Sequence, residues 1–298
     1  MLLRPTRDSP RSQRLNRKRR ALSRARRFLF SRFVRPAAVG SDSLVSRAVP
    51  RDNASLPSAS TSQRLVTEAA RANYDKLAPV WSSATDDGPH NAHLERPMMR
   101  SLLPRPLMGR TVLDLGCGSG AQCEWLLSEG ARVIGVDLSP AMVDAARTRC
   151  HGQGLFFVAN VTEGVNLAPA SLDGITASLV FDYLEDWTAV LLQLRELLRP
   201  RGWIALSDGH PSWVLRTGRM DYFETGVLED TWTKDGVTVA NRYWRRPLGE
   251  AVEHFADAGF IVERIREARP TREALERFPE LDDALSQPSF IGYLLRSA

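Results

Sequence analysis

The sequence predicts a doubly wound α/β fold built on a mostly parallel sheet. Two observations predict it: short apolar segments alternate with helical patterns, and a glycine-rich loop directly follows the first of these segments. Strands separated by helices of about ten to fifteen residues are joined by right-handed crossovers, which leave neighbouring strands parallel. With 43% hydrophobic and 25% charged residues, the 298-residue chain has the composition of a globular protein that buries a core.

Apolar periodicity predicts each element in turn. The expected helices cover residues 63–77, 122–127, 140–150, 187–198 and 247–258. The expected strands cover residues 111–115, 132–137, 155–159, 174–179, 203–207, 260–265 and 290–295. Residues 86–97 are rich in Pro, Gly and Asn, which favours turns. Ser139 and Pro140 are a typical N-cap and first helical residue, so they mark the start of the third helix.

The first 60 residues differ in charge from the rest. They hold 15 basic and three acidic side chains, a net charge of +12, whereas residues 61–298 carry a net charge of −7. We predict a disordered basic tail over residues 1–60 and a single domain over residues 61–298. Three interpretations of the tail stay open: an organelle transit peptide, an arm that binds polyanions, or an upstream start without a structured function.

Composition also indicates the cellular compartment of the protein and whether it binds a metal. No apolar run approaches the roughly 20 residues that cross a bilayer. Three cysteines, an odd number, favour reduced thiols in the cytoplasm over a secreted disulfide framework. His90 and His93 have no cysteine or acidic cluster at metal-binding spacing beside them, so we expect no metal site.

The most informative motif is VLDLGCGSG at residues 112–120. Gly116 and Gly118 follow a strand directly and open a helix, so backbone N–H groups can approach a ligand where a Cβ would clash. Asp137 ends the next strand, 21 residues after Gly116. Doubly wound nucleotide-binding folds place there a carboxylate that binds ribose hydroxyls. The motif predicts a nucleoside-binding crevice at the carboxyl ends of these strands.

The choice of nucleoside depends on Asp114. A dinucleotide pattern G-x-G-x-x-G starting at Gly116 would place its third position at Ala121, a tolerated variant. Asp114, however, stands two residues before the first glycine, and a carboxylate there would repel a pyrophosphate but suit a ligand with an ammonium group. This favours S-adenosylmethionine as the cofactor.

Five motifs now stand in a recognisable order. They cover residues 112–120, 133–142, 160–161, 178–187 and 197–202. In order and spacing they resemble the motifs of class I S-adenosylmethionine-dependent methyltransferases over about residues 74–208. The resemblance implies a Rossmann-like methyltransferase fold with a seven-stranded sheet, one of whose strands is antiparallel near an edge, and a small aromatic-rich insertion after the fifth strand at about residues 209–246.

The resemblance also implies which residues bind the cofactor. On the methionine side, Gly116 and Gly118 would approach the ligand and Asp114 would hold its amino end. Leu179, after the fourth strand, would line the pocket near the sulfonium, and Tyr74 would close over the cofactor.

On the nucleoside side, Asp137 would bind the ribose and Leu138 would pack on the adenine. Asn160, followed by Val161, stands where the family often has Asp for the adenine amino group, and an amide oxygen can accept the same hydrogen bond.

Flanking segments resemble a subgroup of small-molecule methyltransferases of bacterial metabolism. They are YD at residues 74–75, NAHLERP at residues 91–97, and the insertion that starts at His210 and Pro211. Aromatic side chains of this insertion, such as Trp213 and Trp232, suit a planar or apolar substrate and equally suit a small β-rich cap on the core. Both interpretations stay open, and they are compatible.

His210 directly follows the fifth strand, at the edge where an acceptor would meet the methyl group. An imidazole there could take the acceptor's proton, because its ordinary pKa of about 6.5 suits a general base. The alternative is a loop histidine held by Asp208 or by the backbone. Methyl transfer depends mainly on alignment of the reacting atoms, so it does not require a base.

The sequence therefore predicts an S-adenosylmethionine-dependent methyltransferase that acts on an oxygen or nitrogen of a small-molecule metabolite. Two other classes stay open: an RNA methyltransferase that uses the basic tail, which the net charge of −7 on the body opposes, and a non-catalytic nucleoside-binding protein. We expect the protein to bind a small-molecule substrate and not nucleic acid. We also expect no segment that spans a membrane. The expected location is the cytoplasm, with organelle targeting by the tail as the alternative.

Overall fold

The computed structural model describes residues 59–297. The predicted tail lies outside the described residues except for its last two, and the domain boundary at residue 60 stays a prediction. Within the described residues the helices are α3 (Thr61–Thr85), α4 (Arg96–Leu102), α5 (Ala121–Ser128), α6 (Pro140–Arg149), α7 (Trp187–Leu197), α8 (Trp213–Thr217), α9 (Leu248–Asp257) and α10 (Arg272–Arg277). A π-helix covers Asn91–Glu95, and 3-10 helices cover Val161–Glu163, Phe181–Tyr183 and Pro279–Leu285.

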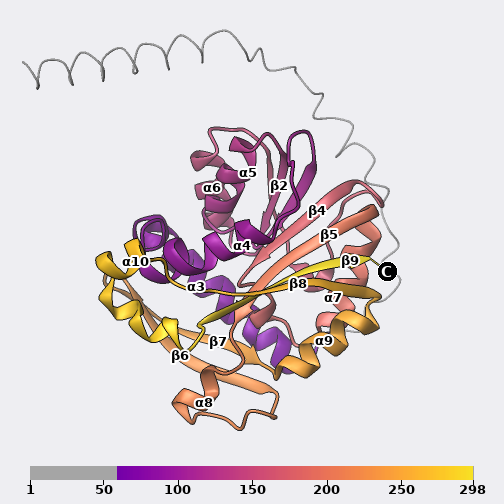
Figure 1. Ribbon diagram of the computed structural model, residues 1–298. Coiled ribbons are helices and arrows are strands. Elements are labelled where there is room, and N and C mark those ends of the chain that lie inside the picture. The colour runs from indigo at the N-terminus through magenta and orange to yellow at the C-terminus, as the bar shows by residue number, and fades with distance from the viewer. Residues whose placement is uncertain (1–58, 298) are drawn as a thin grey trace, which may run out of the picture. The chain divides into compact units, whose positions relative to one another are not determined.

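A seven-stranded sheet organises these helices, with the order β3-β2-β1-β4-β5-β9-β8 (Figure 1). Its strands are β1 (Thr111–Leu115), β2 (Arg132–Asp137), β3 (Leu155–Val158), β4 (Leu172–Ser178), β5 (Leu198–Gly209), β8 (Phe260–Glu267) and β9 (Phe290–Ser297). The first five strands pair in parallel, and β9 runs antiparallel to both β5 and β8. The predicted fold is confirmed, including one antiparallel strand next to an edge.

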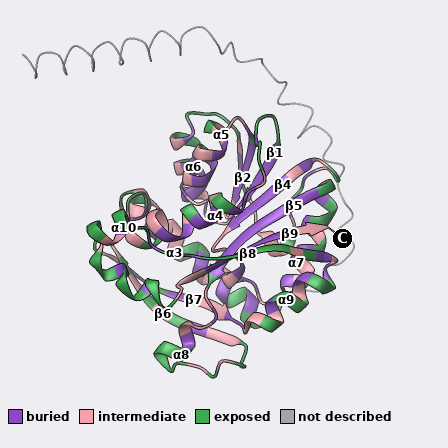
Figure 2. Cartoon of the chain, in the orientation of Figure 1, coloured by how far each residue is buried: buried purple, intermediate pink, exposed green. Residues whose placement is uncertain are grey.

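Each face of the sheet is covered by its own helices (Figure 2). Successive residues of a strand point to opposite faces, so Leu113 packs with α7 and α9 whereas Val112 packs with α4, α5 and α6. Trp187 of α7 and Phe255 of α9 stack in the first of these two cores. Burial on both faces explains why the central strands are almost wholly apolar in sequence.

The insertion after β5 contains α8 and a hairpin of β6 (Gly226–Lys234) and β7 (Val237–Arg245). Helix α3 holds this hairpin by polar contacts: Asn73 Nδ2 donates to the carbonyl of Ala240 at 2.7 Å, and Lys76 Nζ donates to the carbonyl of Thr238 at 2.8 Å. Helix α3 and the insertion therefore lie together over the same edge of the sheet, although they are far apart in the sequence (Figure 1).

The first helices differ from the prediction in length. Helix α3 continues through Pro79 to Thr85. Residues 91–102 are also helical, although seven of these twelve residues fall in the stretch with turn-forming composition. Leu94, Met99 and Leu102 recur at helical spacing and are buried against the sheet, so tertiary burial overrides the local preference. Pro97 stands in the first turn of α4, where a missing N–H is tolerated.

Candidate functional site

One cavity of about 750 Å³ lies at the carboxyl ends of β1, β2, β4 and β5. Doubly wound folds bind their ligands at this edge, and the volume is in the range of small-molecule sites. All ten residues predicted to bind the cofactor or to act in catalysis line it: Tyr74, Asp114, Gly116, Gly118, Asp137, Leu138, Asn160, Val161, Leu179 and His210. The tertiary structure thus brings together every position singled out in the sequence.

Gly116 and Gly118, in the loop after β1, lack a side chain for different structural reasons. Both have a positive φ, 65° at Gly116 and 51° at Gly118. A Cβ on Gly116 would overlap the side chain of Val180, so this glycine allows the chain to pack. A Cβ on Gly118 would meet only Nε1 of Trp81, 3.7 Å away, so this glycine keeps room in front of the α3 side chain. Gly118 is the one whose missing Cβ leaves space for a ligand.

Asp137 connects this loop to the next strand. Its Oδ2 accepts a hydrogen bond from the N–H of Gly118 at 2.8 Å, and its Oδ1 accepts one from the N–H of Ser139 at 2.9 Å. Burial raises the pKa of the carboxyl, while the backbone donors act in the opposite direction. Two ionised oxygens have about four acceptor positions, so the carboxylate can still accept hydroxyl groups. This arrangement fits a ribose.

Asp114 lies deeper, with 2% of its surface exposed. Thr176 donates a hydrogen bond of 2.7 Å to its Oδ1, and the thiol of Cys123 donates one of 3.1 Å to its Oδ2. Burial raises the pKa of Asp114 to about 6. The carboxylate is therefore fixed in place on the floor of the cavity, and a nearby positive charge would stabilise its ionised form.

Asn160 has a structural task of its own. Its Oδ1 accepts hydrogen bonds from the N–H and Oγ1 of Thr162, at 3.1 Å and 2.8 Å, and so caps the 3-10 helix Val161–Glu163. Its Nδ2 donates to Glu163 at 2.8 Å. An adenine amino group would have to compete with Thr162 for the amide oxygen.

Tyr74 belongs to a chain of hydroxyl contacts above the cavity. Its hydroxyl and that of Tyr183 are hydrogen-bonded at 2.9 Å, and Tyr183 donates to Oδ1 of Asn241 at 3.3 Å. The ring of Tyr74 also contacts that of Trp81 edge to face, with centroids 5.2 Å apart. Helix α3, the loop after β4 and strand β7 are joined at this point, so Tyr74 closes one side of the cavity.

Leu179 is held in an unusual backbone conformation, with a φ of 55° in the left-handed region. Its N–H donates to the carbonyl and to the hydroxyl of Ser207, at 3.1 Å and 3.2 Å. A residue that is not glycine keeps such a conformation only where its surroundings enforce it, and strained backbone of this kind is common at ligand sites.

His210 lines the cavity, but protein groups engage both of its ring nitrogens. Nδ1 lies 2.7 Å from Oγ of Ser212, and Nε2 lies 3.0 Å from Oε1 of Glu267. Neither partner is Asp208, the residue considered from the sequence. Burial lowers the pKa of His210, and the neighbouring carboxylate of Glu267 partly offsets this. Its role as a base stays a prediction.

Two carboxyls that the sequence reasoning did not select lie on the acceptor side. The N–H of Gly209 donates to Oδ1 of Asp208 at 3.1 Å and to Oδ2 of Asp182 at 3.4 Å. Burial raises the pKa of both carboxyls, and the charge of Asp182 raises that of Asp208 further. The strand register pairs Ser178 with Ser207, so residues just beyond these positions meet in space. In the sequence, the available signal was that each of these acidic residues follows closely after the end of a predicted strand.

Glu95 was also missed as a site residue, although it lies in the NAHLERP segment. It is buried and lines the cavity, and the hydroxyl of Ser207 donates to its Oε1 at 2.6 Å. Burial raises the pKa of this carboxyl.

The hairpin covers the acceptor side with one of its faces. Residues 230–234 of β6 line the cavity, as do Asn241 and Tyr243 of β7, and within β6 the half-buried Asp230, Trp232 and Lys234 alternate with the exposed Thr231 and Thr233. Trp213 of α8 lines it too, whereas Tyr222, Phe223 and Trp244 do not. The insertion is thus a small β-rich cap that also presents aromatic side chains to the cavity.

Neither a metal-binding cluster nor a membrane-spanning helix is present within residues 59–297. No group of three or more His, Cys, Asp and Glu side chains there could hold a metal ion. His93 instead lies 3.3 Å from a carboxylate oxygen of Asp87. No helix in that part of the chain is long and apolar enough to cross a membrane.

Comparison with known proteins agrees with this geometry. Residues 113–206 match the family model of a methyltransferase domain. The nocamycin O-methyltransferase of Saccharothrix syringae is 29% identical over 219 residues, covering 68% of this chain and 74% of the relative. The ubiquinone biosynthesis O-methyltransferase of Xanthomonas euvesicatoria pv. vesicatoria is 32% identical over 140 residues, covering 45% of this chain and 58% of the relative. The chain spans about half the length of most curated relatives that it matches.

A solved structure extends the likeness over more of the chain. The S-adenosylmethionine-dependent methyltransferase from Mesorhizobium loti is 27% identical with a TM-score of 0.56, covering 71% of this chain and 99% of that one. Residues 113–206 are thus similar to a methyltransferase domain, and the fold is similar to that of an S-adenosylmethionine-dependent methyltransferase.

Proposed function

We propose that the protein transfers the methyl group of S-adenosylmethionine to an oxygen or nitrogen of a small-molecule metabolite. A single observation carries the proposal: one cavity has the glycine loop and Asp137 at one end and the ends of β4 and β5 with the hairpin at the other. A nucleoside cofactor and a second small molecule can therefore meet inside it. Bound S-adenosylmethionine supplies an electrophilic methyl group on a positively charged sulfur.

On the methionine side, the proposal assigns Gly118 to close backbone approach and Asp114 to the amino group. Gly116 shapes the loop, and Leu179 borders the region where the sulfur would lie. Tyr74 covers the ligand from α3, where its hydroxyl already has a partner in Tyr183. The chain's part in the reaction is to hold the reacting atoms in line and to exclude water.

On the nucleoside side, Asp137 accepts hydrogen bonds from the ribose hydroxyls, and Leu138 packs on the adenine. Asn160 and Val161 border the adenine edge. The support is geometric: Asp137 is already oriented by the N–H groups of Gly118 and Ser139 and keeps acceptor capacity.

The proposed acceptor is a small molecule because the hairpin and α3 cover the outer side of the cavity. The two relatives described above have names that make them O-methyltransferases, one for nocamycin and one in ubiquinone biosynthesis. A nucleic-acid acceptor has less support, since residues 61–298 carry a net charge of −7. We also propose a cytoplasmic location, on the basis that Cys117, Cys123 and Cys150 are free thiols.

A labelling experiment tests the function. The full-length protein is incubated with S-adenosylmethionine carrying a trideuterated methyl group and with the small-molecule extract of cells that lack its gene. We expect one metabolite to gain the labelled methyl group, together with release of S-adenosylhomocysteine. In a parallel incubation with total RNA from the same cells, labelling of the RNA that is lost on deletion of residues 1–60 would support the RNA alternative. Absence of S-adenosylmethionine binding in calorimetry would contradict every catalytic reading.

A further inference from the structure

The carboxyls of Asp182 and Asp208 form a pair on the wall of the cavity. Asp182 lies in the 3-10 helix after β4, and Asp208 lies near the end of β5, so two neighbouring strands supply one carboxyl each. The N–H of Gly209 donates to Oδ2 of Asp182 at 3.4 Å and to Oδ1 of Asp208 at 3.1 Å, so the two carboxyls are close neighbours. Both line the cavity, although Asp208 is only 5% exposed.

Burial raises the pKa of both carboxyls, and the charge of Asp182 raises that of Asp208 further. Two neighbouring carboxyls in a buried place disfavour joint ionisation, which favours a single proton shared by the pair at neutral pH. The pair then carries one negative charge and has one ionised carboxyl that can accept a further proton. Because the two groups titrate together, the proton belongs to the pair rather than to either residue.

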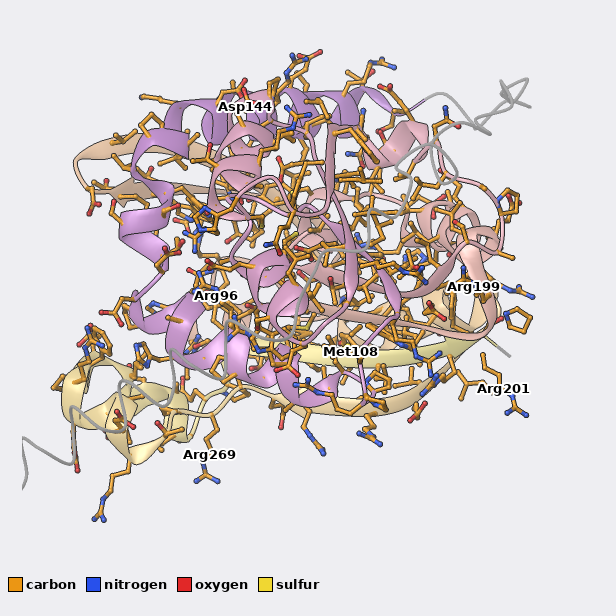
Figure 3. All side chains as sticks on the ribbon, turned by 90° about the horizontal axis from the view of Figure 1, so that it is seen from above. Arg96, Met108, Asp144, Arg199, Arg201 and Arg269 are labelled. Atoms are coloured by element: carbon orange, nitrogen blue, oxygen red, sulfur yellow. The ribbon has the colours of Figure 1, made fainter. Side chains whose placement is uncertain are left out.

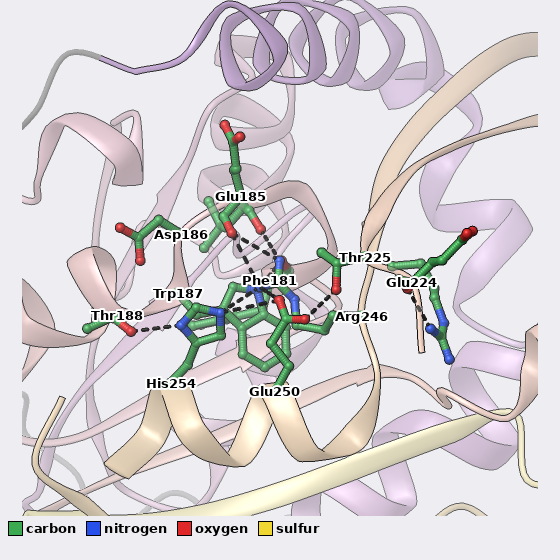
Figure 4. Close-up of polar contacts among 12 residues, drawn as sticks. Phe181, Glu185, Asp186, Trp187, Thr188, Glu224, Thr225, Arg246, Glu250 and His254 are labelled. Atoms are coloured by element: carbon green, nitrogen blue, oxygen red, sulfur yellow. Dashed lines mark hydrogen bonds and ion pairs between the residues drawn. The ribbon is translucent and has the colours of Figure 1, made fainter. Parts of the chain in front are cut away.

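The surroundings of the pair favour this charge without neutralising it. Arg246 acts on both carboxyls, but its guanidinium is 5% exposed and donates to the carbonyls of Leu184 and Glu185 and to Nε2 of His254 (Figure 4). It therefore stabilises the negative charge from a distance. The other titratable groups that act on the pair are Tyr74, Tyr183, Tyr243 and Tyr293. These tyrosines are neutral at physiological pH because their pKa values are raised above about 10.

We propose that the Asp182–Asp208 pair accepts the proton that the acceptor's hydroxyl or amine group loses when it is methylated. The inference rests on the proposed function and names the proton acceptor of that reaction. A bond forms between the acceptor oxygen or nitrogen and the methyl carbon, and the carbon–sulfur bond breaks with its electron pair going to sulfur. The acceptor's proton passes to the ionised carboxyl, and the pair then holds two protons and no charge.

His210 is less suited to this role. Its Nδ1 and Nε2 already contact Ser212 and Glu267, whereas Asp182 and Asp208 both line the cavity. The acceptor would reach the pair between the hairpin and the ends of β4 and β5. We therefore expect the pair to select acceptors that carry a hydrogen-bond donor at the methylated atom.

Asn substitutions test the pair, because they keep the shape and remove the ionisable group. The variants are Asp182→Asn, Asp208→Asn and, for comparison, His210→Gln. Asp144→Asn is the matched control, since Asp144 is 73% exposed on α6, at the periphery of the molecule (Figure 3). The rate is followed with the trideuterated cofactor and the extract described above, across a range of pH.

We expect each pair variant to lose at least a hundredfold in kcat, with the affinity for S-adenosylmethionine unchanged. The fall of the wild-type rate toward acidic pH, where the pair takes a second proton, should disappear or shift in these variants. Pair variants within threefold of the wild-type rate and with the same pH profile would overturn the proposal. The proposal would also be overturned if His210→Gln were the only variant to lose the rate and the fall of the rate toward acidic pH.

A second measurement does not need the acceptor. Infrared spectra of the full chain at neutral pH should contain the band of a protonated carboxyl, which Asp208→Asn removes and Asp144→Asn keeps. Its absence from the wild-type spectrum would contradict a shared proton. If S-adenosylmethionine binds but no small molecule is labelled, the proposed function fails, while the infrared result still decides whether the pair holds its proton.

Discussion

The N–H of Gly118 donates a hydrogen bond of 2.8 Å to Oδ2 of Asp137. This bond joins the loop after β1 to the end of β2, so it fixes these two parts of the proposed nucleoside site relative to each other. It also orients the carboxylate before any ligand arrives, which reduces the cost of ordering it on binding. Glycine and carboxylate therefore act as one unit.

Substitution of Asp137 should remove cofactor binding. Asp137→Ala removes the acceptor of the proposed ribose hydrogen bonds, and charge-assisted bonds contribute about 1.5–3 kcal/mol each, so affinity should fall by about a hundredfold or more. Calorimetry with S-adenosylmethionine measures this, with Asp144→Ala as the control on the surface of α6. Undiminished affinity in Asp137→Ala would show that the cofactor assignment is wrong.

Gly118 can be tested against a glycine with the same backbone conformation. Gly118→Ala and Gly152→Ala both place a Cβ at a positive φ, 51° and 72°, and nothing lies within 4 Å of a Cβ at Gly152. Both variants should lose about 1–2 kcal/mol of stability. Only Gly118→Ala should also weaken S-adenosylmethionine binding, by about tenfold, because its Cβ enters the space in front of Trp81. Equal affinities in the two variants would contradict the assignment.

The affinity for S-adenosylmethionine should depend on pH through Asp114. Its pKa of about 6 means that a proton competes with the cofactor's ammonium group as the pH falls through that value. One pH unit below the pKa, binding should be about tenfold weaker than at neutral pH. Asp114→Asn should bind weakly with little of this dependence. Thermal unfolding is the control, and the variant should be no less stable at neutral pH because burial disfavours the carboxylate it replaces.

Arg246 should be a major contributor to stability. Its Nη2 donates to the carbonyl of Leu184 at 2.6 Å, and its guanidinium lies 4.4 Å from the ring centroid of Trp187. Arg246→Met leaves buried carbonyls without a donor, so the free energy of unfolding in urea should fall by about 2–4 kcal/mol. Arg242→Met, on β7 just before Arg246 but pairing at the surface with Glu229, should change it by about 0–1 kcal/mol. Similar losses in both would refute the role of Arg246.

His254 should make the protein less stable as the pH falls, whereas a buried acid with a raised pKa makes it less stable as the pH rises. Its Nε2 lies 3.0 Å from Nη1 of Arg246 and accepts its hydrogen bond, which requires an unprotonated nitrogen. Burial, and then the charge of Arg246, lower the pKa of His254 from 6.5. Its stabilisation is therefore fully present above about pH 6.5 and is lost as the pH falls through the lowered pKa. His254→Gln should show a shallower decline in urea unfolding toward acidic pH, and an unchanged decline would contradict this account.

The secondary structure was largely predictable because burial leaves a periodic trace. The strands lie within a few residues of their predicted positions, since apolar runs and the loop after β1 mark them directly. The π-helix Asn91–Glu95 and the extension of α3 were not predicted, because turn-forming residues dominate locally while the sheet supplies the burial that keeps these segments helical.

The sequence by itself determined the doubly wound fold and the positions of the residues proposed to bind the cofactor, because Gly116, Gly118 and Asp137 sit at fixed places on consecutive strand-to-helix turns. Only the tertiary structure decided the acceptor side. It paired Asp182 with Asp208, gave both nitrogens of His210 protein partners, and laid the hairpin against α3. These contacts join residues far apart in the chain, and whether a carboxyl meets another carboxyl or a histidine depends on packing that local patterns do not record.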